Sequence, residues 1–209
     1  MIEWHPFSVT SGPEEEDLEI HVRALGDWTK KLHSLAKRKQ ELTVLVDGPY
    51  GSLRLDYHRY SHLMLVAGGI GFTPILGLLK DIYFSKRAHF THNKFIDVIW
   101  SIADESNAKW FEVELQQIAK KAISFGLPSL KLSIHVTRSQ ALPLPVKFTA
   151  ACPHDFLVQA PKAPLLAGRP KMKEVFEAVA DSLHTRACLV FVCGPEGMVR
   201  ACCVVSCRR

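Results

Sequence analysis

The sequence predicts an α/β fold, in which a parallel sheet with flanking helices is preceded by a small β-rich part. Two observations support this prediction. After residue 60, apolar runs of strand length alternate with helical patterns, and this alternation is typical of a parallel sheet covered by helices. Before residue 60, short runs with period two and turn residues dominate instead. We therefore expect two domains, over residues 1–60 and 61–209.

The first domain is predicted to contain short strands and one helix. Apolar and polar residues alternate over Leu18–Leu25, which predicts a strand with Arg23 on its polar face. Asp27 begins a short amphipathic helix, because apolar residues follow it at helical spacing. Further strands are predicted over Trp4–Thr10 and over LTVLV at 42–46, which the turn residues DGPYG follow.

In the second domain, predicted strands and helices alternate. The strands are LMLVA at 63–67, FIDVIW at 95–100, LKLSIHVT at 130–137 and CLVFVC at 188–193. The helices are Pro74–Phe84, a helix in which Phe111, Leu115, Ile118, Ala122 and Phe125 step by four and three, KMKEVFEAVADSL at 171–183, and one that starts in PEGMVRACC at 195–203. Residues 143–170 have no period and hold half of the 12 prolines, so we expect a loop there.

Composition excludes several classes of protein. A chain of 209 residues with 47% hydrophobic side chains can bury an ordinary core, and a net charge of +5 is mild. The tight basic run at 37–39 fits a solvated helix end better than a nucleic-acid stripe, so no nucleic-acid partner is expected. No apolar stretch reaches membrane-helix length and no signal peptide is recognisable, so we expect this chain alone to be soluble. The 6 cysteines lack paired zinc or disulfide spacing, which suits a reducing compartment without a metal site.

The segment GGIGFTP at 68–74 lies between a predicted strand and a predicted helix. Its glycines allow backbone N–H groups to approach an anion, Thr73 can cap the helix, and Pro74 suits the first turn. Pro74 stands where the usual dinucleotide fingerprint has its third glycine. From the residues alone, the segment is either a phosphate loop or a plain strand-to-helix turn.

Several motifs together resemble a known family. HPFSVTS, HVRALGDWTKKL, VDGPYGS, LVAGGIGFTP, IHVTRS, GRPKMKEVF and VFVCGP occur in the order found in the ferredoxin-NADP reductase superfamily. More narrowly, the chain resembles the C-terminal flavin and nicotinamide half of the ferric reductase and NADPH oxidase family. The segments W-S-I-A, H-V-T-R and G-D-W-T-K-K-L are most similar to the corresponding segments of plant ferric-chelate reductases. The resemblance implies a partial FAD-binding barrel over residues 1–60 and an NAD(P)H-binding domain over 61–209.

For the flavin, the resemblance implies a set of residues early in the chain. Phe7 would flank the flavin and Ser8 would act catalytically by a hydrogen bond near its reactive nitrogen, although Phe7 could equally be a core residue. Arg23 would pair with the FAD diphosphate, or else form a surface ion pair. The whole implied set is His5, Pro6, Phe7, Ser8, Val9, Thr10, Ser11, Arg23, Trp28 and Thr29.

For the nicotinamide nucleotide, the resemblance implies residues that follow the first and last predicted strands of the second domain. The glycine loop would hold the diphosphate, and the CGP segment would border the nicotinamide. Cys193 would be catalytic there, or would be a small buried apolar residue. The implied set is Gly68, Gly69, Ile70, Gly71, Thr73, Pro74, Cys193, Gly194 and Pro195.

The choice between NADPH and NADH depends on a 2′-phosphate contact. Arg138 and Arg169 are the candidates for that contact. NADPH oxidases carry an arginine shortly after the tryptophan of the second strand, whereas here Ala103 and Asp104 follow Trp100. The sequence favours NADPH because of Arg138 and Arg169. It leaves NADH open, because Asp104 would repel a 2′-phosphate if it pointed inward.

The resemblance implies a flavin-dependent oxidoreductase portion that passes electrons from NAD(P)H through FAD to heme and then to ferric chelate. The heme would belong to a membrane domain of the parent protein, with this region on the cytosolic side. One alternative is the dehydrogenase domain of an NADPH oxidase that reduces oxygen to superoxide. Another is a non-catalytic nucleotide-binding fragment, because the chain begins near the fourth of the barrel's six strands and ends before the family's terminal aromatic residue.

Overall fold

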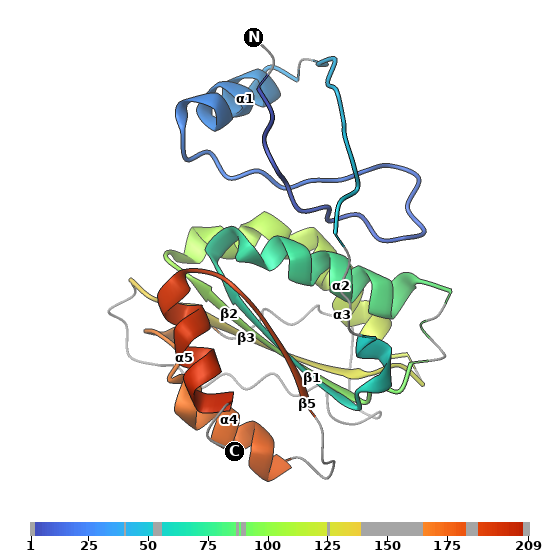
Figure 1. Cartoon of the computed structure of the whole chain (residues 1–209), viewed down its shortest axis with the longest axis vertical. Coiled ribbons are helices and arrows are strands. Elements are labelled where there is room, and N and C mark those ends of the chain that lie inside the picture. Colours follow the sequence, from blue (N-terminus) through green and yellow to red (C-terminus); the bar gives the residue numbers. More distant parts are fainter. Residues whose placement is uncertain are drawn as a thin grey trace.

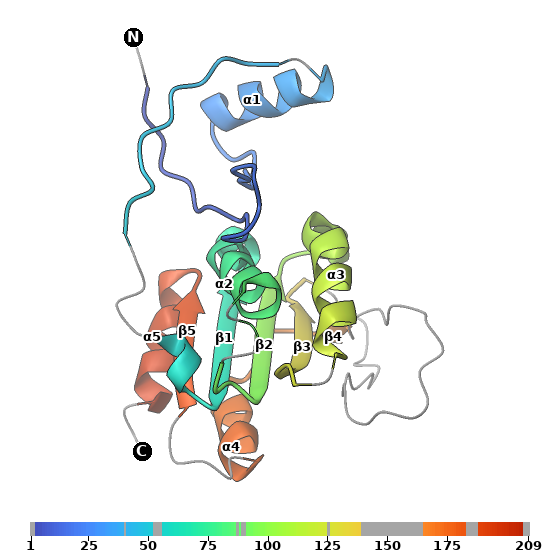
Figure 2. The same ribbon diagram turned by 90° about the vertical axis from the view of Figure 1, so that its right-hand side faces the viewer.

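The computed structural model describes residues 3–39, 41–51, 56–86, 88, 91–124, 126–138, 165–182 and 188–206. Its centre is a five-stranded sheet in the order β4-β3-β2-β1-β5, in which every neighbouring pair is parallel (Figures 1 and 2). The strands are β1 (His62–Gly68), β2 (Phe95–Ile102), β3 (Ser129–Val136), β4 (Leu165–Ala167) and β5 (Cys188–Cys193). The α/β prediction for the second domain is therefore confirmed.

Helices cover both faces of this sheet. Figure 1 shows α2 and α3 on one side of the sheet and α4 and α5 on the other. Their bounds are α2 (Thr73–Phe84), α3 (Glu112–Ala122), α4 (Met172–Ser182) and α5 (Glu196–Ser206), and the 3-10 segments are η1 (Tyr57–Arg59), η2 (Gly69–Phe72) and η4 (Glu105–Phe111). Each helix lies where the sequence predicts one, although Phe125 and Leu183 fall outside the described residues.

The side chains of β1 explain why the sheet is covered on both sides. Leu63 and Leu65 are fully buried in the core beneath α2 and α3. Met64 and Val66 point the other way, into a second core that includes Met172 of α4 and Cys202 of α5. A central parallel strand must bury both faces, and this is why its sequence is a continuous apolar run rather than an alternating one.

The N-terminal segment lies over the face that α2 and α3 form, and α1 (Asp27–Lys37) stands away from the sheet (Figures 1 and 2). The predicted helix is confirmed, and it begins where expected. Thr29 stabilises its first turn, because the Thr29 hydroxyl oxygen accepts hydrogen bonds from the backbone N–H groups of Leu25 and Gly26 at 2.9 and 3.0 Å. No described residue of α1 is buried.

The prediction of strands in the N-terminal segment is wrong. Residues 4–10, 18–25 and 42–46 contain one isolated antiparallel bridge, Val9–Ile20, and no ladder among the described residues. Extended backbone becomes a strand only when a neighbour pairs its N–H and C=O groups. At 42–46 no such neighbour is found within the described part of the chain, and Val44, Leu45 and Val46 are each 68% exposed.

The loop predicted at 143–170 is also partly wrong. Residues 165–167, near its end, form β4, which pairs in parallel with the end of β3. A strand of 3 residues is too short to show a period, so its pairing could not be predicted from the pattern. Residues 143–164 lie outside the described residues.

Candidate nucleotide site

The candidate site lies at the carboxyl ends of β1 and β5. These strands are neighbours in the sheet, but the chain leaves β1 toward β2 and reaches β5 only after β4. Such a reversal is a topological switch point, and in open α/β sheets ligands bind in the crevice outside it. The glycine loop follows β1 and the CGP segment follows β5, so the fold brings two predicted motifs to this position.

These two motifs pack directly against one another. A Cβ atom at Gly71 would lie 2.5 Å from the carbonyl oxygen of Cys193, and one at Gly68 would lie 2.5 Å from Cδ of Pro195. A Cβ at Gly194 would approach the backbone nitrogen of Gly68 to 3.0 Å. These glycines therefore permit close contact between two loops, and this role is independent of any ligand.

The start of α2 differs in one detail from the expectation. Thr73 was expected to cap the helix, but Phe72 is the N-cap residue and Thr73 is already helical. The Thr73 hydroxyl instead donates a hydrogen bond to the carbonyl oxygen of Ile70 at 3.1 Å. The reason is the 3-10 turn over Gly69–Phe72, which runs directly into the helix. Pro74 does occupy the first turn, as expected.

Gly69 faces an open space beside a charged side chain. Its φ of +55° suits glycine, and the atom nearest to its Cβ position is Nη1 of Arg23 at 3.8 Å. The Arg23 guanidinium also lies over the ring of Trp110, with Cζ 5.6 Å from the ring centroid. In the part of the chain that the structure describes, Arg23 has no carboxylate partner. A free guanidinium beside an open glycine backbone fits a diphosphate.

Trp100 is a site residue whose contact the motifs did not predict. It is fully buried at the carboxyl end of β2, and its indole Nε1 donates a hydrogen bond to the carbonyl oxygen of Gly69 at 2.9 Å. This bond fixes the position of the glycine loop relative to β2. A tryptophan within an apolar strand was the available signal, because a buried indole N–H requires an acceptor.

Cys193 is the last residue of β5 and lies half-buried against Gly71 of the glycine loop. Burial raises the pKa of its thiol, so the thiolate is disfavoured at neutral pH. A nucleophilic role therefore receives no support from its surroundings, whereas a bordering role next to the nicotinamide remains compatible with them. The catalytic assignment of Cys193 stays a prediction.

On the flavin side, aromatic rings gather without being buried. The ring of His5 lies 4.1 Å from that of Trp28, and the ring of Phe7 stacks on Trp28 at 5.9 Å between centroids. Phe7 is 37% exposed and Trp28 36% exposed. Phe7 is therefore not a core residue in this structure. Pro6, Ser8 and Val9 lie on the same exposed segment.

Other members of the predicted flavin set bond within the protein. Thr10 is buried and donates a hydrogen bond to the carbonyl oxygen of Glu19 at 3.1 Å. Ser11 accepts a hydrogen bond from the backbone N–H of Glu19 at 3.1 Å, and the Thr29 hydroxyl serves α1. These hydroxyl groups hold the segment in shape, and their contact with a flavin remains a prediction.

The two arginines proposed for a 2′-phosphate follow neighbouring strands. Gly168 donates a backbone hydrogen bond to Val136 at 2.8 Å, which aligns the ends of β3 and β4. Arg138 and Arg169 come just after this bond and are both exposed. Asp104 accepts hydrogen bonds from the hydroxyl and the backbone N–H of Ser106 at 2.7 and 2.9 Å, and these bonds, helped by Arg138, lower its pKa.

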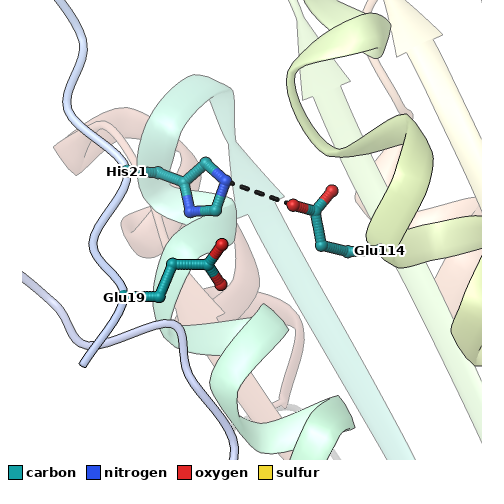
Figure 3. Close-up of side chains that lie close together, drawn as sticks. All are labelled: Glu19, His21 and Glu114. Atoms are coloured by element: carbon teal, nitrogen blue, oxygen red, sulfur yellow. Dashed lines mark ion pairs between the residues drawn. The ribbon is translucent and has the colours of Figure 1, made fainter. Parts of the chain in front are cut away.

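A further polar cluster joins the N-terminal segment to the helices (Figure 3). Glu19, His21 and Glu114 offer ligand atoms that lie within 4.8 Å of one another. Each of these groups is already engaged: Nζ of Lys80 lies 2.8 Å from Glu19, Nδ1 of His21 lies 2.9 Å from the Thr10 hydroxyl, and its Nε2 lies 3.5 Å from Glu114. Because the Lys80 ammonium also opposes a cation, we assign the cluster to docking of the segment on α2 and α3. The absence of a metal site stays a prediction.

Comparisons of the sequence identify the family. The family model described as "Ferric reductase NAD binding domain" matches residues 60–204, and the one described as "FAD-binding domain" matches residues 1–54. NADPH oxidase 1 of Rattus norvegicus is 32% identical over 97% of this chain, and NADPH oxidase 3 of Homo sapiens is 30% identical over 95%. The chain spans 38% and 37% of the lengths of these two relatives.

Solved structures support the fold at low sequence identity. Flavohemoglobin from Malassezia yamatoensis with bound FAD and heme has a TM-score of 0.60 at 18% identity, and the match covers 97% of this chain and 43% of that one. Ferredoxin-NADP+ reductase from Plasmodium falciparum with 2′P-AMP has a TM-score of 0.52 at 13% identity, covering 97% and 71%. These likenesses agree with the parallel sheet described above. From the matched domain models and relatives, the chain belongs to the ferric reductase and NADPH oxidase family and comprises its FAD-binding and NAD-binding regions.

Proposed function

We propose that the chain passes electrons from NADPH to FAD within a larger reductase or oxidase. The observation that carries this proposal is the meeting of three parts at one switch point: the glycine loop after β1, the CGP segment after β5, and Arg23 from the flavin-binding segment. Arg23 places a positive charge beside Gly69, and this charge suits the diphosphate of a dinucleotide.

The residues supply binding and orientation rather than acid–base chemistry. Gly69 leaves room for a diphosphate, Arg23 supplies its counter-charge, and Cys193 with Pro195 forms one wall. Phe7 and Trp28 offer exposed ring faces to the flavin. When bound, the nicotinamide supplies a hydride and FAD accepts it, then releases electrons one at a time. Such transfer depends chiefly on holding the rings in contact.

The cofactor and the final acceptor are part of the proposal. Arg138 and Arg169, at aligned strand ends, favour NADPH over NADH. Heme in a membrane domain of the parent protein would receive the electrons, with this region on the cytosolic side. Among the described residues, no helix is long and apolar enough to cross a bilayer. Ferric chelate and oxygen are the two candidates for the final electron acceptor. The relatives favour oxygen, since one in Dictyostelium discoideum is named a superoxide-generating NADPH oxidase subunit.

A direct test measures flavin reduction by the chain itself. The purified chain is saturated with FAD, mixed with NADPH without oxygen, and the absorbance of oxidised flavin is followed. The proposal predicts bleaching much faster than for the same concentration of free FAD, with a rate that saturates as NADPH rises. A rate equal to that of free FAD would contradict it and would favour the non-catalytic alternative.

A further inference from the structure

Arg23 and Trp110 form a contact between distant parts of the chain. Arg23 belongs to the segment before α1, and Trp110 belongs to η4, which follows β2. The distance of 5.6 Å from Cζ to the ring centroid lies within the range of a cation–π contact. Nη1 of the same guanidinium is the atom nearest to the Cβ position of Gly69. Trp110 therefore contacts a charged side chain that borders the open face of Gly69.

Trp110 is a rigid support for this contact. It is half-buried and packs against the main core, and its neighbour Phe111 is fully buried. The ring of Phe111 lies 5.2 Å from Phe72 and 5.5 Å from Trp100. Trp100 also holds the Gly69 carbonyl, so the core against which Trp110 packs contacts the glycine loop as well. A long flexible side chain gains a defined position from such a platform.

We infer that Trp110 is a positioning residue: it holds the Arg23 guanidinium beside the glycine loop for the diphosphate of a dinucleotide, without touching the cofactor itself. The inference rests on the proposed function, because it requires that a dinucleotide binds at this loop. FAD and NADPH share the diphosphate, so the ligand class is defined while the source is left to experiment. The planar guanidinium can stack on the ring and donate to phosphate oxygens at its edge at the same time.

The test compares two substitutions of the same residue in the full chain. Trp110→Leu keeps an apolar side chain and removes the π face, whereas Trp110→Phe keeps a π face. Dissociation constants for FAD and for NADPH are measured separately by titration. Trp110→Leu is expected to weaken the dinucleotide that Arg23 contacts by roughly two- to fivefold, the effect of a cation–π contact at an exposed site, and Trp110→Phe should retain most of the affinity.

Two controls separate positioning from general damage. In an Arg23→Ala background, Trp110→Leu should cause no further loss, because the group that it positions is gone. Binding of 2′-phospho-AMP, which has no diphosphate, should be the same in Trp110→Leu and the unmodified chain. The dinucleotide that loses affinity identifies the source of the diphosphate.

Each contrary outcome has its own meaning. If the unmodified chain binds neither dinucleotide, the proposed function fails and this inference fails with it. If it binds them and Trp110→Leu changes neither affinity, the inference alone is overturned. Equal losses in the Arg23→Ala background, or a matching loss for 2′-phospho-AMP, would show that Trp110 has only a structural role.

Discussion

Single glycines of the glycine loop are constrained by the atoms that face them, and Gly71 faces a backbone atom. Its Cβ position lies 2.5 Å from the carbonyl oxygen of Cys193, which is backbone and cannot rotate away. Gly71→Ala must therefore push the two loops apart, and overpacking of this kind costs about 1–3 kcal/mol. We expect the urea midpoint of unfolding to fall accordingly, together with a loss of NADPH affinity.

Gly197 in α5 is the matched control. No atom lies within 4 Å of its Cβ position, and its backbone is helical. Gly197→Ala should therefore leave stability unchanged or raise it by up to about 1 kcal/mol. If Gly71→Ala were as mild as Gly197→Ala, the contact between the glycine loop and the CGP segment would not be close in solution.

Asp104 is predicted to oppose the 2′-phosphate of NADPH. Hydrogen bonds from Ser106 lower the pKa of Asp104, so its carboxylate is charged at neutral pH and lies in the neighbourhood of Arg138. Asp104→Asn keeps a side chain suited to capping η4 and removes the charge. We expect the dissociation constant for NADPH to fall by roughly two- to fivefold, in line with exposed charge pairs, while that for NADH barely changes.

Titration of both cofactors in the same buffer checks this prediction. Arg138→Ala should have the opposite effect on NADPH: its dissociation constant should rise, while that for NADH should barely change. An equal change for NADPH and NADH in Asp104→Asn would mean that Asp104 acts on the fold of η4 and not on the phosphate.

Among the elements, α2 carries the clearest link to the N-terminal segment. Lys80 of α2 is nearly buried, and its Nζ lies 3.0 Å from Glu15 and 2.8 Å from Glu19. The hydrogen bond from Lys80 is the main reason that the pKa of Glu19 is lowered. A carboxyl group with a lowered pKa stabilises the docked state above its ordinary pKa, and this contribution is lost as pH falls through the lowered value.

Docking of the segment should therefore weaken in acid, below the ordinary glutamate value of 4.5. Hydrogen exchange of residues 9–22 measures it, and protection should fall in that range in the unmodified chain. Glu19→Gln cannot titrate, so its protection should be lower at neutral pH and should respond less to acid. An identical acid response in Glu19→Gln would show that other groups control the docking.

The elements also show where sequence reasoning succeeds. Four of the five strands in the parallel sheet were predictable. For a central strand such as β1, burial on both faces leaves a continuous apolar run. The N-terminal strands were not, because alternation reports the faces of a chain but not the neighbour that must pair with it. β4 was missed because its 3 residues carry no period.

For the whole molecule, the motifs could be predicted but not most of their mutual contacts. The glycine loop and the CGP segment are each recognisable in sequence, and the strand order places them side by side. The approach of Arg23 to Gly69 and Trp110 depends on how the N-terminal segment docks on α2 and α3, which no local pattern encodes. Trp100 was visible as a marker of its strand, but its bond to Gly69 was not.

The proposed function requires one site that holds the nicotinamide against the flavin, and the stereochemistry of hydride transfer shows whether such a site exists. NADPH labelled with deuterium at either of the two C4 positions is oxidised by the FAD-saturated chain, and the NADP+ formed is analysed by mass spectrometry. A fixed site presents one face of the ring, so one isomer should lose its deuterium and the other should keep it. If both isomers gave NADP+ with the same mixed deuterium content, transfer would occur outside a defined site and the account would be contradicted.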